Sequence, residues 1–279
     1  MRLGLQLYTL RELLPADPAG VLWAVRAAGF DDVEAASTDG IAELRARCDA
    51  AGLGLRDAFY GGTAVTGNHE LLAAAFGPAA VPRQTFPEMV DAAAAAGCEA
   101  MVFGYLLPGE RATADDYRRR ADEINAAAER VRAAGMRHRY HHHSFEFLPL
   151  PGPGGLRGWD ILTERLDPEL TAWEVDVFWA RLGGLDPVAF LGELGARVGA
   201  IHLKDFPADA APQYDEHAVA PADFLPVGAG ALDVDGVLAA AERWGVERLV
   251  VEQDASPAPL DDVARSAGHL RRRGRSVKT

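Results

Sequence analysis

The chain is poor in cysteine, and the two cysteines that it has lie far apart. Cys48 and Cys98 are separated by fifty residues, and no CxxC pair is present. A disulfide framework or a thiolate metal site needs closer or more numerous cysteines, so this spacing argues against both. We therefore expect two reduced packing residues in a cytoplasmic protein.

Long apolar runs and an excess of positive charge are also lacking. No stretch approaches the roughly 20 apolar residues of a membrane span, and the opening MRLGLQLYTLRE does not resemble a secretion signal. The formal charge of -13 repels phosphate backbones and anionic lipid, so we expect neither nucleic acid nor a membrane as partner. The basic run from Arg271 to Arg275 is interpreted as a short solvated tail that begins at about residue 271.

What the chain does contain is a repeated junction in which an alanine-rich helix ends in glycine and an apolar strand follows. Glycine adopts the left-handed conformation that closes a helix, so each copy predicts a helix-to-strand joint. The five copies have their glycines at Gly29, Gly52, Gly97, Gly135 and Gly245.

These joints, with further strands at 3–8, 171–178 and 198–204, predict eight strands near residues 3, 32, 54, 100, 136, 171, 198 and 247. Amphipathic helices are expected between them at 18–28, 41–51, 86–96, 114–134, 156–166, 187–194, 234–244 and 260–271. Alternating strands and helices require parallel pairing, and eight such units predict an α/β fold, a TIM (β/α)8 barrel spanning residues 1–279 as one domain. The rival is a doubly wound open sheet, but no GxGxxG or GxxxxGK[ST] motif follows a predicted strand.

Polar residues recur at the expected C-terminal ends of the last four strands, where barrel enzymes place their reacting groups. Strand alternation puts His202 and Lys204 on one face of their strand, and Glu174 and Asp176 on one face of theirs. Glu252 ends the eighth strand. In the segment YHHHSFEF, His141 and His143 share a face, His142 is assigned to structure, and Glu146 lies beyond in the loop.

This convergence predicts a divalent metal ion. An unpaired carboxylate inside a barrel mouth costs several kcal/mol unless something compensates it, and a cation would do so. Three carboxylates and one imidazole form a hard ligand set that favours Mn²⁺, Mg²⁺ or Co²⁺ over Zn²⁺. Four protein ligands leave room for two neighbouring oxygens of a small-molecule sugar substrate.

The residues also resemble the sugar phosphate isomerase/epimerase superfamily, the xylose-isomerase-like TIM barrels. Seven fragments carry the resemblance in order along the chain: GLQLYTLR at 4–11, VEAAS at 33–37, YHHHSFEF at 140–147, WEVDVFWA at 173–180, IHLKDF at 201–206, VGAGALDV at 227–234 and VVEQD at 250–254. Each fragment is weakly specific, but together they cover nearly the whole chain.

The resemblance implies a metal set that falls on Glu146, Asp176, His202 and Glu252. It further implies that Glu146 and Glu252, or the pair of His141 and His143, move a proton beside a carbonyl. Relatives often have a glutamate where this chain has His141, so the first ligand stays open among His141, His143 and Glu146. A second departure is Phe59, at a strand end where relatives often have histidine.

Other residues are predicted to contact the substrate. Lys204 is a candidate to neutralise a developing oxyanion, or else to form a salt bridge with a neighbouring aspartate. Gln6, Tyr8, Glu34 and His141 are candidates for binding sugar hydroxyls. Phe178 and Trp179 are candidates for an apolar wall, with core packing as the alternative.

The sequence thus predicts a divalent-metal-dependent sugar isomerase or epimerase that abstracts a proton α to the carbonyl of a keto-sugar or related polyol. Alternatives on the same site are a dehydratase of an inosose-like or 3-keto-sugar substrate, and a non-catalytic sugar-binding barrel. A barrel endonuclease of DNA repair shares the fold, but the net negative charge argues against it. The sugar, its phosphorylation and the oligomeric state of the protein stay open.

Overall fold

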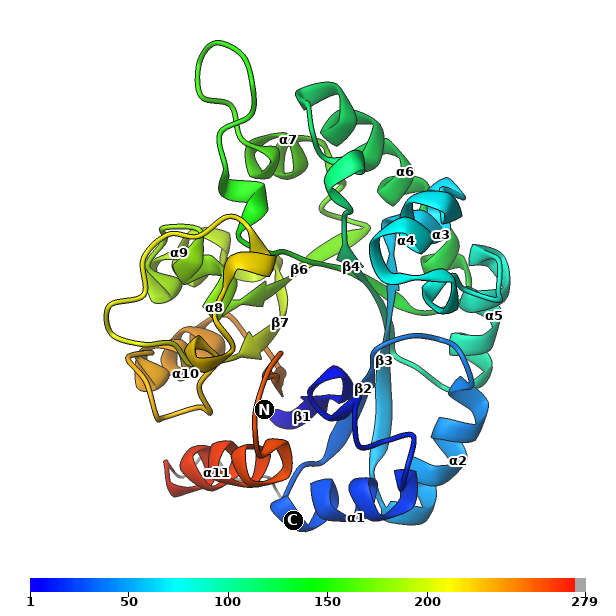
Figure 1. Ribbon diagram of the computed structural model, residues 1–279, viewed down its shortest axis with the longest axis vertical. Coiled ribbons are helices and arrows are strands. Elements are labelled where there is room, and N and C mark those ends of the chain that lie inside the picture. The colour runs from blue at the N-terminus through cyan, green and yellow to red at the C-terminus, as the bar shows by residue number, and fades with distance from the viewer. Residues whose placement is uncertain (274–279) are drawn as a thin grey trace.

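A closed barrel of eight parallel strands forms the centre of the molecule (Figure 1). The computed structural model describes residues 1–273. Each strand pairs with its neighbour in sequence, and β1 pairs with β8 to close the barrel. The strands are β1 Arg2–Gln6, β2 Asp32–Ala35, β3 Gly54–Gly61, β4 Ala100–Tyr105, β5 Arg137–His141, β6 Thr171–Asp176, β7 Val198–Leu203 and β8 Arg248–Val251. The predicted TIM barrel is confirmed.

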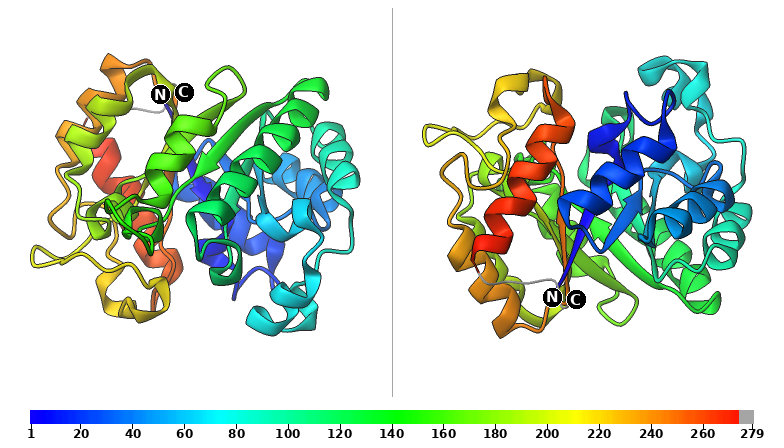
Figure 2. Two further views of the ribbon diagram at one scale, coloured as in Figure 1. Left: turned by 90° about the horizontal axis from the view of Figure 1, so that it is seen from above. Right: turned by 90° about the horizontal axis from the view of Figure 1, so that it is seen from below.

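The helices surround the strands, and the first and last of them lie side by side (Figure 2). They are α1 Pro18–Ala28, α2 Ile41–Ala51, α3 Gly62–Thr66, α4 His69–Phe76, α5 Phe86–Ala95, α6 Ala114–Ala133, α7 Gly158–Arg165, α8 Val177–Leu182, α9 Pro187–Leu194, α10 Val234–Arg243 and α11 Pro259–Arg272. The eight predicted helices are present within one or two residues of their expected bounds. Helices α3, α4 and α8 were not predicted, and all three follow the C-terminal end of a strand. Within residues 1–273, none of the helices combines the length and apolarity needed to cross a bilayer.

The glycine joints take the conformation that the repeat predicts. Gly29, Gly52, Gly97, Gly135 and Gly245 all have φ between 70° and 102°. At the first joint, the amides of Gly29 and Phe30 bond to carbonyls of the last turn of α1, so the helix stops and the chain turns into β2. This local rule is why five of the strand starts could be placed from sequence.

Two strands end two residues earlier than predicted, because polar side chains end them, and β7 ends one residue earlier, at Leu203. β1 ends at Gln6, and Tyr8 lies in a 3-10 turn, Leu7–Leu10. β6 ends at Asp176, whose Oδ1 accepts hydrogen bonds from the amides of Phe178 and Trp179 and so starts α8. The expected strand 171–178 is therefore wrong in its last two residues.

The expected basic tail also begins too early. Helix α11 runs to Arg272, and Arg271 donates to the carbonyl of Ala28 at the end of α1. Arg273 donates to Asp235 at 2.8 Å. Gly274 and Arg275 lie outside the described residues.

Buried ion pairs fill the N-terminal half of the barrel interior, where branched apolar side chains are usual. Arg139 donates to Asp57 at 2.6 Å, and Arg248 donates to Asp32 at 2.6 Å and lies 2.8 Å from Asp57. Gly4 leaves space for this group, because a Cβ there would lie 2.6 Å from Asp32. We call these four side chains (Asp32, Asp57, Arg139 and Arg248) the lower layer.

Candidate metal centre and substrate pocket

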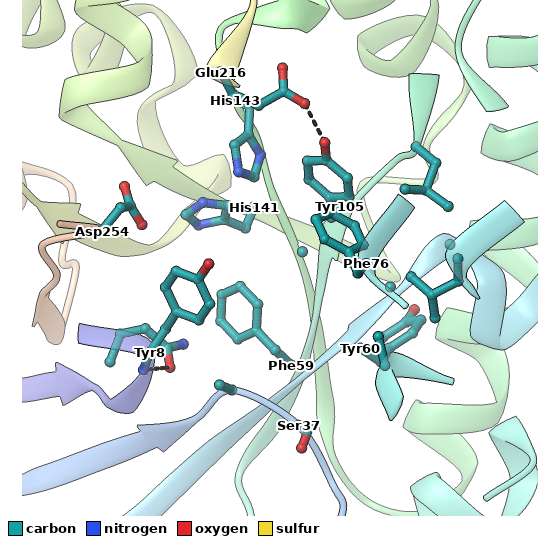
Figure 3. A pocket seen from close by; sticks show the side chains of 18 of the residues that line it. Tyr8, Ser37, Phe59, Tyr60, Phe76, Tyr105, His141, His143, Glu216 and Asp254 are labelled. Atoms are coloured by element: carbon teal, nitrogen blue, oxygen red, sulfur yellow. Dashed lines mark hydrogen bonds between the residues drawn. The ribbon is translucent and has the colours of Figure 1, made fainter. Parts of the chain in front are cut away.

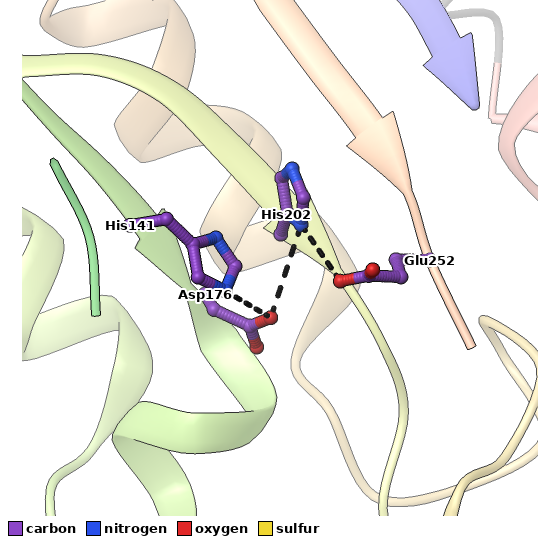
Figure 4. A group of neighbouring side chains, drawn as sticks. All are labelled: His141, Asp176, His202 and Glu252. Atoms are coloured by element: carbon purple, nitrogen blue, oxygen red, sulfur yellow. Dashed lines mark hydrogen bonds and ion pairs between the residues drawn. The ribbon is translucent and has the colours of Figure 1, made fainter. Parts of the chain in front are cut away.

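Four side chains from four strand ends converge at the other end of the barrel (Figure 4). His141 ends β5, Asp176 ends β6, His202 is on β7, and Glu252 follows β8. Each offers one ligand atom, and these atoms all lie within 4.8 Å of one another. His202 Nδ1 is 3.0 Å from Glu252 Oε2, and Asp176 Oδ2 is 3.9 Å from His141 Nε2. We call this group the upper cluster.

The upper cluster has the donors that a divalent ion requires. Asp176 binds the start of α8 through Oδ1, which leaves Oδ2 buried and directed into the cluster, where Lys204 Nζ lies 3.0 Å from it. Two imidazoles and two carboxylates suit several first-row metals. Because His141 takes the position expected for a carboxylate, the set is softer than predicted, and zinc fits it as well as manganese or cobalt.

Lys204 is the ammonium group closest to the upper cluster. Its Nζ lies 2.7 Å from Glu252, 3.0 Å from Asp176 and 2.8 Å from Asp254, and the side chain is 1 % exposed. Although burial acts against it, these three carboxylates hold the pKa of Lys204 well above its ordinary value. The predicted salt bridge with Asp176 is present, and Asp254 is a partner that the sequence did not single out.

A second pair of carboxylates lies on the far side of the His202 ring. Glu34 Oε2 is 2.8 Å from His202 Nε2 and also accepts a bond from Gln6, while Glu174 Oε2 is 3.3 Å away. Burial and the neighbouring Glu174 raise the pKa of Glu34 to about 8. A carboxylate on one imidazole nitrogen fixes the tautomer and leaves the other nitrogen free for a metal.

Glu34 therefore does not reach the position predicted for a sugar contact. It is fully buried and is absent from the pocket wall, because the pleat of β2 directs it inward under His202. Gln6, one of its partners, lies on the pocket wall as expected.

Glu146 likewise lies apart from the three residues with which it was predicted to bind metal. The 3-10 turn Phe145–Phe147 carries its carboxylate back beneath the loop. There it accepts hydrogen bonds from the Tyr140 hydroxyl and the His143 amide, both at 2.9 Å. The side chain is fully buried and does not line the pocket. Among residues 1–273 two groups of side chains could hold a metal ion, and Glu146 belongs to neither of them. His141 stands in its place because it is the residue on which β5 ends.

The remaining predicted residues divide between the pocket wall and the core. Tyr8, His141, His143, Lys204 and Glu252 all line the pocket above the upper cluster, as Figure 3 shows for the first three. Phe178 does not line it: this ring is fully buried and stacks on Phe224 with centroids 4.7 Å apart. The start of α8 turns it away, and the neighbouring Trp179 lines the pocket instead.

Phe59 occupies the floor of the pocket, at the strand end where a histidine was expected. Its ring centroid is 5.4 Å from that of His141 and 5.9 Å from that of His202. Gly104 on β4 admits the ring, since a Cβ there would lie 2.3 Å from it. The sequence marked Phe59 as a departure, but only the barrel shows that it packs against two predicted ligands.

Comparison with known proteins agrees with this geometry. The family model described as "Xylose isomerase-like TIM barrel" matches residues 22–273. The chain belongs to this family. No curated protein matches it.

Several solved structures share the fold. A sugar phosphate isomerase/epimerase from Parabacteroides distasonis is 22% identical, with 96% of this chain and 93% of that chain covered and a TM-score of 0.75. The IOLI protein, whose structure contains a zinc atom, is 13% identical over all of both chains, with a TM-score of 0.70. A D-psicose 3-epimerase from Clostridium cellulolyticum, solved with D-tagatose, is 14% identical over 98% and 99%, with a TM-score of 0.66. At these identities the likeness concerns the fold.

Proposed function

We propose that the protein is a divalent-metal-dependent isomerase or epimerase that moves a proton α to the carbonyl of a keto-sugar or related polyol. The observation that carries this proposal is a deficit of positive charge at the upper end of the barrel. Five carboxyl groups, those of the buried Glu34, Glu174, Asp176 and Glu252 and of the partly exposed Asp254, face one ammonium group and the imidazole of His202, and Arg139 lies 3.8 Å from Glu174. A buried, uncompensated carboxylate is costly, and a divalent cation would offset two of these charges.

His141, Asp176, His202 and Glu252 are the residues that would hold the ion. A divalent ion bound there would act as a Lewis acid toward substrate oxygens. The support for this set is the convergence of one ligand atom from each residue, with Asp176 Oδ2 directed into the cluster while Oδ1 caps α8. Zinc, manganese, cobalt and magnesium remain candidates, and the zinc in the IOLI structure favours testing zinc first.

Two groups on the pocket wall, Glu252 and His143, are candidates for proton transfer. Although burial acts against it, Lys204 and His202 hold the pKa of Glu252 well below its ordinary value, so Glu252 is ionised, as a metal ligand or a proton acceptor must be. Burial lowers the pKa of His143 well below its usual range, so this imidazole is neutral, and its Nδ1 has no hydrogen-bond partner. Lys204 Nζ lies close enough to Glu252 to stabilise negative charge on a substrate oxygen beside it.

Loss of a β-hydroxyl after the same proton abstraction would make the protein a dehydratase, which is the second candidate on this site. A barrel that only binds sugar would not need the excess of carboxyl groups over cations that lies at the upper end, which argues against that alternative. The negative charge of the chain still argues against a DNA-repair endonuclease. A cytoplasmic location stays a prediction.

The test is exchange of a substrate proton with solvent. Purified protein is incubated in D₂O with D-fructose, D-tagatose and D-psicose, and deuterium at the carbons beside the carbonyl is followed by NMR. We expect exchange that a chelator abolishes and that added metal restores. Asp115→Asn, an exposed change on α6, is the matched control for Asp176→Asn and should keep full exchange. Absence of exchange with these sugars and with 3-keto-glucosides, in protein shown to contain metal, would refute the proposed reaction.

A further inference from the structure

The pocket above the upper cluster extends well beyond the predicted metal ligands. Its volume is about 630 Å³, within the range of roughly 300 to 1,000 Å³ that takes a drug-sized ligand. The polar end of the pocket is formed by Gln6, His141, Lys204 and Glu252.

The rest of the pocket is an apolar arm. It runs between the ends of β3 and β4 and the two helices α3 and α4. In Figure 3, Phe59 lies between Asp254 on one side and the aromatic side chains of the arm, such as Phe76 and Tyr105, on the other. Phe76 on α4 is 52% exposed and faces Tyr105, with centroids 6.2 Å apart. Binding of an apolar group to this wall is favourable, because it removes apolar surface from water. Its lining includes Phe59, Tyr60, Ala64, Leu72, Phe76 and Leu107.

The pocket wall offers no unpaired cation for an anionic substrate. Among the described residues, Lys204 is the one lysine or arginine that lines it, and its ammonium already contacts three carboxylates. Arg111, behind the wall, is bound to Glu216 at 2.6 Å. Of the acidic residues in the lining, Glu110, Glu216 and Asp254 are paired with Arg120, Arg111 and Lys204, and Asp39 adds a negative charge, so a phosphate group would meet repulsion and no free cation.

The backbone that usually binds phosphate in such barrels is also occupied. TIM barrels frequently bind phosphate through the loops after the seventh and eighth strands. In this chain the glycine-rich loop after β7 donates its amides inward to Asp205: Gly228 at 2.8 Å, Gly230 at 3.0 Å and Leu232 at 2.9 Å. The side chain of Asp205 is fully buried, so a carboxylate of the protein holds the position that an anion would take.

We infer that the substrate is an uncharged keto-sugar derivative with an apolar substituent, such as an aryl glycoside of a keto-sugar, and that phosphorylated sugars are excluded. The sugar ring would lie at the polar end beside Glu252 and His141, and the substituent would fill the apolar arm beyond Phe59. This inference rests on the proposed function, which assigns binding of the sugar to the polar end of the pocket.

The experiment measures binding and does not depend on turnover. The probes are glycosides that lack the keto group and therefore bind without reacting. Titration calorimetry on the metal-loaded protein compares methyl β-D-glucopyranoside, 4-nitrophenyl β-D-glucopyranoside and the 6-phosphate of the latter, together with the two corresponding galactopyranosides. We expect the nitrophenyl glycoside of the accepted sugar to bind at least tenfold more tightly than the methyl glycoside. The 6-phosphate should bind at least tenfold more weakly than its parent.

A pair of tryptophan substitutions tests where the substituent lies. Ala64→Trp fills the apolar arm and should abolish the preference for nitrophenyl over methyl, while the methyl glycoside binds unchanged. Ala75→Trp places the same side chain on the exposed face of α4 and should keep the preference, and melting temperatures confirm that both variants fold.

Three results would overturn the inference: equal binding of methyl and nitrophenyl glycosides, tighter binding of the phosphate, or no binding of any of these glycosides. Tight nitrophenyl binding in a protein that shows no proton exchange would support the inference and would refute only the proposed reaction.

Discussion

The two ends of the barrel interior both bury carboxylates, but they neutralise them differently. In the lower layer two carboxylates face two guanidinium groups, with contacts of 2.6 to 2.8 Å, so the charges balance. At the upper end, five carboxyl groups share Lys204 and the His202 imidazole, and one of them, Glu174, also lies 3.8 Å from Arg139 of the lower layer. Arginine presents a fixed fork that completes a structural ion pair, whereas imidazoles and free carboxylate oxygens are metal donors.

This difference teaches which buried charges serve the fold and which serve chemistry. A balanced layer supports the barrel and requires nothing from outside the chain. An unbalanced layer that opens onto a pocket lowers the stability of the protein unless a ligand completes it, and proteins tolerate that cost at functional sites.

The largest expected effect is on the balanced layer. Arg248→Met removes the guanidinium partner of Asp32 and one of the two partners of Asp57, and both carboxylates stay buried, so the free energy of unfolding should fall by about 3–5 kcal/mol. Denaturant unfolding measures it. Added metal should not restore the loss, and a variant as stable as the wild type would show that this layer contributes little.

The next effect concerns the upper cluster. Asp176→Asn should weaken metal binding by at least about 100-fold and abolish proton exchange, because the amide is a poor donor in place of the buried Oδ2. Calorimetric titration with zinc and manganese measures the affinity. Metal binding at wild-type strength would remove Asp176 from the ligand set, with Asp115→Asn as the control.

A smaller effect is expected beneath the cluster. Glu34→Gln keeps the shape of the side chain that orients His202 but weakens the charge that fixes its tautomer, so metal affinity should fall by about 10-fold to 100-fold. If Glu34 bound substrate directly, as the sequence suggested, the variant would change sugar binding and leave the metal affinity intact.

The smallest effect on the metal is expected from Glu146→Gln, less than about threefold, because this carboxylate caps its own loop. A larger loss would return Glu146 to the ligand set.

The same substitution should change the pH dependence of stability. Burial raises the pKa of Glu146 from 4.5 to about 8. The folded protein therefore binds more protons than the unfolded chain in this interval, and its stability falls as pH rises through it, by up to about 1.4 kcal/mol per pH unit. Unfolding of Glu146→Gln between pH 5 and pH 8 should show a smaller fall than that of the wild type.

Local rules made most of the barrel predictable. Glycine at the end of a helix and alternation along strands depend on a few neighbouring residues, so Gly29 and its equivalents located the joints, and parity placed His202 with Lys204. The errors arose where a polar side chain formed a hydrogen bond that strand alternation does not predict. Asp176 capped a helix and turned Phe178 into the core, and Glu146 found Tyr140 below its own loop.

The sequence by itself determined the eight-unit barrel and the strand ends that carry Asp176, His202 and Glu252, because both follow from short-range geometry repeated along the chain. Only the tertiary structure decided that His141 joins these three, that Glu34 lies behind His202, and that an apolar arm continues past Phe59. Those outcomes depend on which side chains meet across a closed barrel. Local sequence patterns do not predict the distances between residues that lie far apart in the chain.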